Sequence, residues 1–129
     1  MARTLDLTRT FLHVRDGGDL DPIEVGPGFF RESIAERTYD RVAGVFAFET
    51  GDDLHSSLQE VHPQADELLF LLEGAIDVVI DGEDGRETVS LEAGHALVVP
   101  RGRWHHLIVR APGRFFFLNS RTGMQSRKA

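Results

Sequence analysis

Short apolar runs separated by turn-forming residues dominate the chain from residue 42 onward. Gly, Pro and Asp punctuate the runs, as in DGEDG, EAG, PRG and APG. Runs of this length and spacing, without a helical period, predict an antiparallel all-β sandwich or closed barrel. The runs are VAGVFAFET, SSLQEVH, ELLFLLEG, AIDVVIDG, RETVSLEAG, HALVVP, WHHLIVR and RFFFLNS.

Glycine and proline positions predict where these strands reverse. Gly74 separates ELLFLLE from AIDVVID and predicts a tight reversal between two strands, because glycine accepts positive φ. Pro100 and Gly102 fit a turn in which proline fixes φ and glycine relaxes it. We expect these residues to have structural rather than chemical roles.

Both ends of the chain differ from this apolar region. DGGDLDPIEVGPGFF is dense in Gly, Pro and Asp and predicts turns and irregular loop, whereas FFRESIAERTYDR fits either a short helix or an edge strand. The polar C-terminal stretch SRTGMQSRKA is typical of a frayed end. We therefore expect one β domain at 42–120, a loop or edge segment at 1–41 and a flexible tail at 121–129.

Composition narrows the class of protein. A chain of 129 residues can bury a core in one domain, and the absence of cysteine excludes disulfides and thiolate metal sites. Fourteen Lys and Arg against 21 Asp and Glu give a net charge of −7, which argues against nucleic-acid and anionic-membrane partners. Without a signal-like or membrane-spanning apolar stretch, we expect a soluble cytoplasmic protein.

Charged and imidazole side chains interrupt the apolar runs. Alternate residues of a strand share a face, so Glu60 and His62 point the same way, and alone they fit a solvated surface. Glu67 follows just beyond HPQAD, where a hairpin would fold Glu67 back beside His62. His105 and His106 begin a later strand on opposite faces, and periodicity leaves open which of them points inward.

The spacing of these residues resembles that of the cupin superfamily. Its first motif, G-x5-H-x-H-x(3,4)-E-x6-G, corresponds to Glu60-x-His62-x4-Glu67-x6-Gly74, with the second half matched in full. Its second motif, G-x5-P-x-G-x2-H-x3-N, corresponds to Gly94-x5-Pro100-x-Gly102-x2-His105 and departs at Val109, where Asn is usual. The resemblance implies a single-domain jelly-roll β-barrel, also called a double-stranded β-helix, with an irregular N-terminal segment.

The resemblance also implies a divalent metal inside the barrel. Carried over by position, Glu60, His62, Glu67 and His105 are its ligands, with Glu60 in the place of the first motif histidine. Such nitrogen and oxygen ligands suit Fe, Mn, Ni or Zn. If Glu60 does not bind, it stands beside a two-histidine, one-carboxylate site as a general base. The exchange could also mark a barrel that has lost its metal; we favour a bound metal.

Fold alone does not choose the reaction of such a protein. The resemblance favours an enzyme acting on a small organic molecule, oxygenase-like or lyase- or isomerase-like, with a dioxygenase slightly preferred. The alternatives are a barrel that binds or senses a metal or small ligand without turnover, and a structural barrel with a vestigial site. Resembling small cupins pair through sheet edges, so a homodimer is expected.

Overall fold

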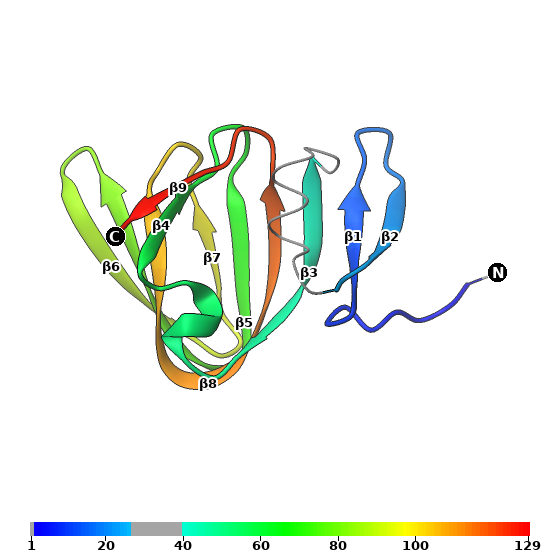
Figure 1. Ribbon diagram of the computed structural model, residues 1–129, viewed down its shortest axis with the longest axis horizontal. Coiled ribbons are helices and arrows are strands. Elements are labelled where there is room, and N and C mark those ends of the chain that lie inside the picture. The colour runs from blue at the N-terminus through cyan, green and yellow to red at the C-terminus, as the bar shows by residue number, and fades with distance from the viewer. Residues whose placement is uncertain (1, 27–39) are drawn as a thin grey trace.

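The computed structural model describes residues 2–26 and 40–129, and most of the segment FFRESIAERTYDR lies outside these ranges. The described part contains strands and one short 3₁₀ helix, η1 (Gly51–Leu54), as Figure 1 shows. The strands are β1 (Thr10–Val14), β2 (Leu20–Glu24), β3 (Arg41–Phe48), β4 (Leu58–Val61), β5 (Glu67–Gly82), β6 (Gly85–Glu92), β7 (Ala96–Val99), β8 (His105–Ser120) and β9 (Gln125–Lys128). None of the helices in the described ranges is long and apolar enough to span a membrane.

Two 16-residue strands, β5 and β8, pair along their lengths and organise the sheet. The N-terminal part of β8 pairs with the C-terminal part of β5, and we call these parts with β6, β4 and β9 half-sheet A. The N-terminal part of β5 pairs with the C-terminal part of β8, and we call these parts with β7, β3, β1 and β2 half-sheet B. Figure 1 shows β6, β4 and β9 on one side and β3, β1 and β2 on the other.

The predicted all-β jelly roll is confirmed, but the predicted closed barrel is not. Hydrogen-bonded pairing in the described ranges runs β2-β1-β3-β8-β4-β9, with β6 and β7 paired only to β5. Closing the sheet would require an outer strand of half-sheet A to pair with one of half-sheet B. The two half-sheets are instead joined by β5 and β8 and by a shared apolar core.

Gly74 does not reverse the chain, contrary to the sequence-based expectation. It lies inside β5 at φ 90, where register shifts between Leu71 and Ala75 mark a bulge opposite β8. A Cβ at Gly74 would come within 2.5 Å of the Pro112 carbonyl oxygen, and one at Gly113 within 1.8 Å of the Glu73 oxygen. The two backbones therefore approach closely here, and both strands continue through a bend where turns were expected.

The N-terminal segment contains a hairpin where irregular loop was expected. Strand β1 pairs with β2 and extends half-sheet B by pairing with β3, Leu12 opposite Ala43. Phe11 is buried and packs edge-to-face on Phe117, with ring centroids 5.1 Å apart. Pro22 is tolerated because β2 is the outermost of the described strands on this side of the sheet, where a missing N–H breaks no ladder. Burial of Phe11 stabilises a strand that the turn-rich sequence concealed.

The C-terminal stretch also differs from its expected frayed form. Strand β9 pairs with β4 through four residue pairs, from Leu58 opposite Lys128 to Val61 opposite Gln125. Arg127 fixes it by donating hydrogen bonds to Gln59 (2.8 Å) and Asp81 (3.2 Å), with its guanidinium 4.0 Å from the Trp104 ring centroid. Backbone pairing and this arginine order a segment whose side chains are almost all polar and exposed.

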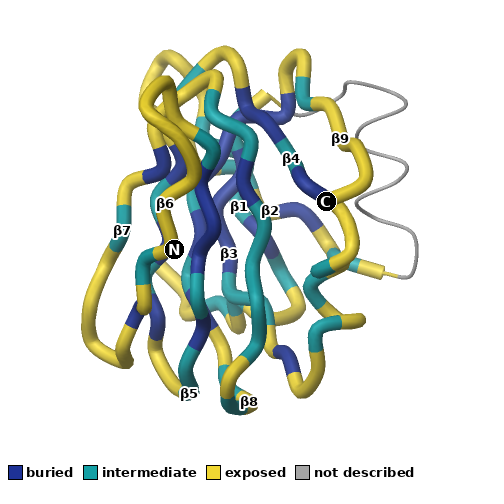
Figure 2. Tube along the Cα trace, turned by 90° about the vertical axis from the view of Figure 1, so that its left-hand side faces the viewer, coloured by how far each residue is buried: buried dark blue, intermediate teal, exposed yellow. Residues whose placement is uncertain are grey.

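The core lies between the two half-sheets. Its buried members come from both, and Figure 2 shows buried positions along β3 and β4 and exposed ones along the β6 hairpin and β9. The cluster consists of Phe11, Ile23, Val42, Phe48, Leu69, Leu71, Ile76, Val78, Ile80, Leu91, Val99, Phe115 and Phe117.

We expect Gly113→Ala to lower the free energy of unfolding by about 1–3 kcal/mol, because its new methyl group must displace backbone at the bend. Gly17→Ala is the matched control, since a Cβ there meets nothing within 4 Å, and its effect should stay within about 0.5 kcal/mol. Urea denaturation of both variants measures the difference. Equal stabilities would contradict the close approach of β5 and β8.

Candidate metal centre

The four side chains predicted as ligands converge at the end of the half-sheets away from the bend. Glu60 on β4 lies directly opposite His105 on β8 in the sheet register, so both side chains project from the same face of half-sheet A. Glu67 is the first residue of β5, in half-sheet B, and His62 directly follows β4. His62, Glu67 and His105 are buried, whereas the Glu60 side chain is 40% exposed.

Glu67 and His62 lie close together, as predicted, but they are not brought together by the predicted hairpin. Strand β4 pairs with β8 and β9, while β5 pairs with β6, β7 and β8, so the HPQAD segment crosses between the half-sheets. Two backbone N–H groups of the turn before β8 donate hydrogen bonds to this crossing. The N–H of Gly102 donates to the His62 oxygen (3.0 Å), and the N–H of Arg101 donates to Asp66 Oδ1 (3.0 Å).

Glu67 lies between the two imidazoles. Its Oε1 is 3.0 Å from His105 Nε2, and its Oε2 is 3.4 Å from His62 Nε2. His62 Nε2 is also 3.9 Å from Glu60 Oε2. One ligand atom from each of Glu60, His62 and His105 lies within 4.8 Å of the others, so these three side chains could hold a metal ion. Glu67 is outside that group of three, yet its carboxylate lies 3.0 Å from His105 Nε2 and 3.4 Å from His62 Nε2.

Backbone carbonyls fix the orientation of both imidazoles. His62 Nδ1 lies 2.8 Å from the Ser120 oxygen, and His105 Nδ1 lies 3.1 Å from the Arg103 oxygen. Since a carbonyl oxygen only accepts, each Nδ1 carries a proton, and when a ring is neutral the lone pair of its Nε2 faces Glu67. Lone pair and carboxylate repel each other unless a proton or a metal cation lies between them. A buried donor set of this kind fits a divalent metal.

The same contacts shift the pKa values of the three buried groups. Burial acts to raise the pKa of Glu67, but hydrogen bonds and charge from His105 and His62 outweigh it and hold that pKa far below its ordinary value. Burial acts to lower the pKa of His62 and His105, but the carboxylate of Glu67 outweighs it, so both imidazole pKa values are raised. Glu67 therefore stays ionised and attracts a positive charge to the two nitrogens.

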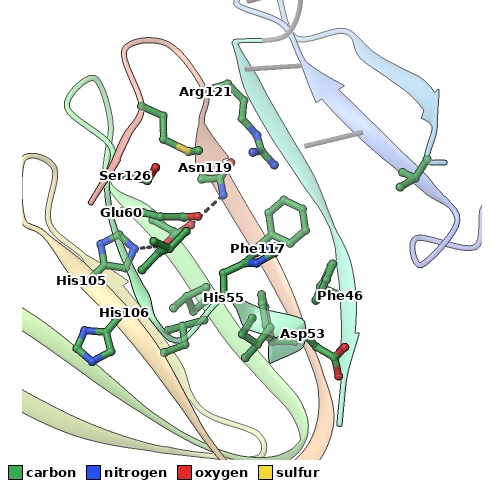
Figure 3. A pocket seen from close by; sticks show the side chains of 18 of the residues that line it. Phe46, Asp53, His55, Glu60, His105, His106, Phe117, Asn119, Arg121 and Ser126 are labelled. Carbon is green, nitrogen blue, oxygen red and sulfur yellow. Dashed lines mark hydrogen bonds and ion pairs between the residues drawn. The ribbon is translucent and has the colours of Figure 1, made fainter. Parts of the chain in front are cut away.

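A cavity of about 650 Å³ opens over this centre (Figure 3), large enough for a small organic ligand. His105 points to the centre, since its Nε2 is 3.0 Å from Glu67 Oε1, although both His105 and His106 line the cavity. Most of the wall is apolar, from Phe46, Leu54, Leu69, Phe115 and Phe117 among others.

Sequence reasoning missed several polar and C-terminal residues of the cavity. Asn119 and Arg121 continue the alternation of Phe117 on the inward face, so strand periodicity could have found both. Asn119 Nδ2 donates to Glu67 Oε2 (2.9 Å) and so steadies the central carboxylate. Met124 directly precedes β9 and Ser126 lies in it, and no sequence signal distinguished them from a frayed end.

Comparison with known proteins identifies the class. The family model described as "Cupin domain" matches residues 45–119, more than half of the chain, and the chain therefore belongs to the cupin family. The family predicted from the motif spacing is confirmed. A comparison with curated proteins finds no significant match.

Solved structures support the same fold. Oxalate oxidase in complex with the substrate analogue glycolate has a TM-score of 0.51 at 21% identity, over 67% of this chain and 45% of that one. Vicilin from Solanum lycopersicum (tomato) has a TM-score of 0.51 at 13% identity, over 68% and 24%. Hydroxypropylphosphonic acid epoxidase from S. wedmorenis has a TM-score of 0.50 at 20% identity, over 65% and 45%. The chain thus spans less than half of these proteins, and at such identities the likeness shows the fold alone.

Proposed function

We propose that this protein is a metal-dependent cupin enzyme that acts on a small organic molecule in the cavity between the half-sheets. The observation that carries the proposal is the buried Glu67 carboxylate, which faces the Nε2 atoms of two imidazoles. The Nδ1–H groups of both imidazoles donate to backbone carbonyls instead. Glu60, His62, Glu67 and His105 would hold the ion. Two carboxylates and two neutral imidazoles balance the charge of Fe, Mn, Ni or Zn as dications.

When bound, a divalent metal supplies Lewis acidity or, for a redox-active ion, the capacity to react with O₂. The residues of the chain do the remaining work. His62 and His105 are fixed by their carbonyl partners, and Asn119 holds Glu67, so the donor set is oriented before a ligand enters. The apolar wall excludes water from the bound molecule and strengthens polar contacts inside the cavity.

The Glu60 side chain is partly exposed, so it could act either as a metal ligand or as a general base. Its position opposite His105 favours metal ligation, whereas its open side toward the cavity suits a general base that reaches the substrate. We favour ligation, because Glu60 stands at a ligand position of the motif.

An oxygenase-like reaction is preferred over a lyase- or isomerase-like one. The homodimer and the cytoplasmic location stay predictions.

A second candidate function is a cupin that binds or senses a metal or small ligand without turning it over. The observation that favours it is the same set of oriented ligands, because a donor set that holds a metal in a cavity needs no catalytic group to bind a ligand. The two functions differ in turnover but share metal content.

Catalysis is tested by incubating the purified protein with a pool of small organic acids, sugars and phenols while O₂ uptake and product masses are followed. We expect turnover that stops after treatment with a chelator and returns when the removed metal is restored. His105→Ala serves as the matched control without a metal site. Turnover that persists in protein verified as metal-free would contradict the proposal, and a metal-loaded protein without turnover would favour the binding function.

The role of Glu60 is tested by isothermal titration of metal into three variants. Under ligation, Glu60→Gln should bind metal clearly more weakly than the wild type while its fold survives, because the amide keeps the shape but removes the charge. Glu60→His should retain metal, with a changed preference among Fe, Ni and Zn, and His62→Ala should bind none.

The general-base role gives a different result for the same variants. Glu60→Gln would then keep full metal occupancy and lose roughly 10²- to 10⁴-fold in rate. Full occupancy in Glu60→Gln beside an empty His62→Ala would overturn ligation by Glu60. Circular dichroism of each variant verifies that the sheet has formed.

A further inference from the structure

The C-terminal part of β8 presents a polarity gradient to the cavity. Phe115, Phe117, Asn119 and Arg121 alternate along the chain, and all four line the cavity. The two rings are buried within the apolar core, whereas the Asn119 amide lies beside Glu60 (Figure 3), and the charges of Glu60 and Glu67 act on the Arg121 guanidinium. A molecule lying along this strand therefore meets an apolar surface at one end and polar groups beside the proposed metal at the other.

Arg121 places a permanent positive charge in this wall. Its residue surface is only 5% exposed, and guanidinium remains protonated in proteins. The charges of Glu60 and Glu67 act on it, and its backbone N–H is anchored on the Asp40 oxygen at 2.5 Å. A guanidinium that borders a ligand cavity is suited to a carboxylate, because its fork of N–H donors matches two carboxylate oxygens.

The cavity wall favours a negatively charged group on the ligand. Glu60 and Glu67 together neutralise a dication, and Arg121 is the only Arg or Lys among the described residues that line the cavity. Asp53 also borders the cavity, but it is exposed and lies away from Glu60 in Figure 3. Its carboxylate accepts hydrogen bonds from the N–H groups of Glu49 (2.8 Å) and Thr50 (3.1 Å). A ligand with one carboxylate group therefore matches the one guanidinium among the described residues of this wall.

Asn119 adds a hydrogen-bond acceptor next to Arg121. A carboxylate can only accept, so the group of Asn119 that faces Glu67 Oε2 is the amide nitrogen, and Oδ1 faces elsewhere. Asn119 is 8% exposed, and its Oδ1 is a buried atom without a hydrogen-bond partner among the described residues. Such an acceptor is costly unless a donor meets it, and a hydroxyl or amine of a bound ligand would do so.

We propose that the cavity binds an organic monocarboxylate with an apolar body, with its carboxylate on Arg121, a neighbouring hydroxyl or amine on Asn119 Oδ1, and its apolar part against Phe115 and Phe117. This inference rests on the proposed metal site for its charge balance. It names the chemical class of the substrate, which the fold leaves open.

The test compares three related probes by isothermal titration into protein loaded with Ni²⁺, an ion that suits mixed nitrogen and oxygen ligands. Phenyllactate carries the carboxylate, the hydroxyl and an apolar ring. Phenylpropionate lacks the hydroxyl, and phenylpropanediol replaces the carboxylate with a neutral hydroxymethyl group. Metal content is measured in every sample, so that loss of the metal site and loss of carboxylate recognition are seen separately.

We expect the wild type to bind phenyllactate roughly 10- to 100-fold more tightly than phenylpropanediol, because a hydrogen bond to a charged group is lost in the diol. Phenylpropionate should bind more weakly than phenyllactate. Arg121→Gln should lose the preference for the acid, and Arg121→Lys should keep part of it as a point charge. Arg110→Gln is the matched control, since Arg110 is exposed and pairs with Asp77, and it should bind as the wild type does.

Equal binding of phenyllactate and phenylpropanediol by the wild type overturns the inference, and so does no binding of either. If Arg121→Gln fails to fold, the folded Arg121→Lys variant decides the matter, because coordination of the hydroxy acid by Ni²⁺ does not depend on the side chain at residue 121. A folded Arg121→Gln that keeps the full preference for the acid also overturns it. A wild type that retains no Ni²⁺ yet prefers the acid refutes the proposed metal function but supports recognition of the carboxylate by Arg121.

Discussion

The buried Glu67 carboxylate, held against two imidazole nitrogens, is the interaction on which the site depends. It joins the two half-sheets, since Glu67 begins β5 in half-sheet B while His105 begins β8 in half-sheet A. An ionised group in this position is tolerated only when positive charge and hydrogen bonds compensate its lost hydration. The carbonyl partners of both rings and the amide of Asn119 leave the two Nε2 atoms as the place for that charge.

The bend in β5 and β8 allows Glu67 and His105 to come into contact. Because both strands continue through the bulge near Gly74 and Gly113, each contributes to both half-sheets, and the first residues of each strand meet across the interior. Burial of Phe115 and Phe117 between the half-sheets stabilises that arrangement and also forms the apolar wall of the cavity. The packing that holds the fold together thus shapes the ligand site.

The resemblance of the motif spacing to that of the cupin superfamily predicted the fold and the four side chains that converge in the structure, whereas strand alternation alone left their direction open. Neither predicted the bend, since a glycine between two apolar runs fits a turn as well as a bulge. Strand β1 was concealed by its turn-rich surroundings, and β9 by its exposed polar side chains. Both strands depend on contacts distant in sequence, Phe11 on Phe117 and Arg127 on Asp81. Periodicity along a single run contains no information on such contacts, which is also why Met124 and Ser126 were missed.

The metal content of protein purified without added metal tests the central claim most directly. Elemental analysis of the wild type, beside His62→Ala and His105→Ala prepared in the same way, should find a first-row divalent metal close to stoichiometric in the wild type and little in either variant. The expectation follows from the two Nε2 atoms facing an ionised carboxylate. A folded wild type that is metal-free and takes up none of Fe, Mn, Ni or Zn on titration would contradict a metal centre at Glu67.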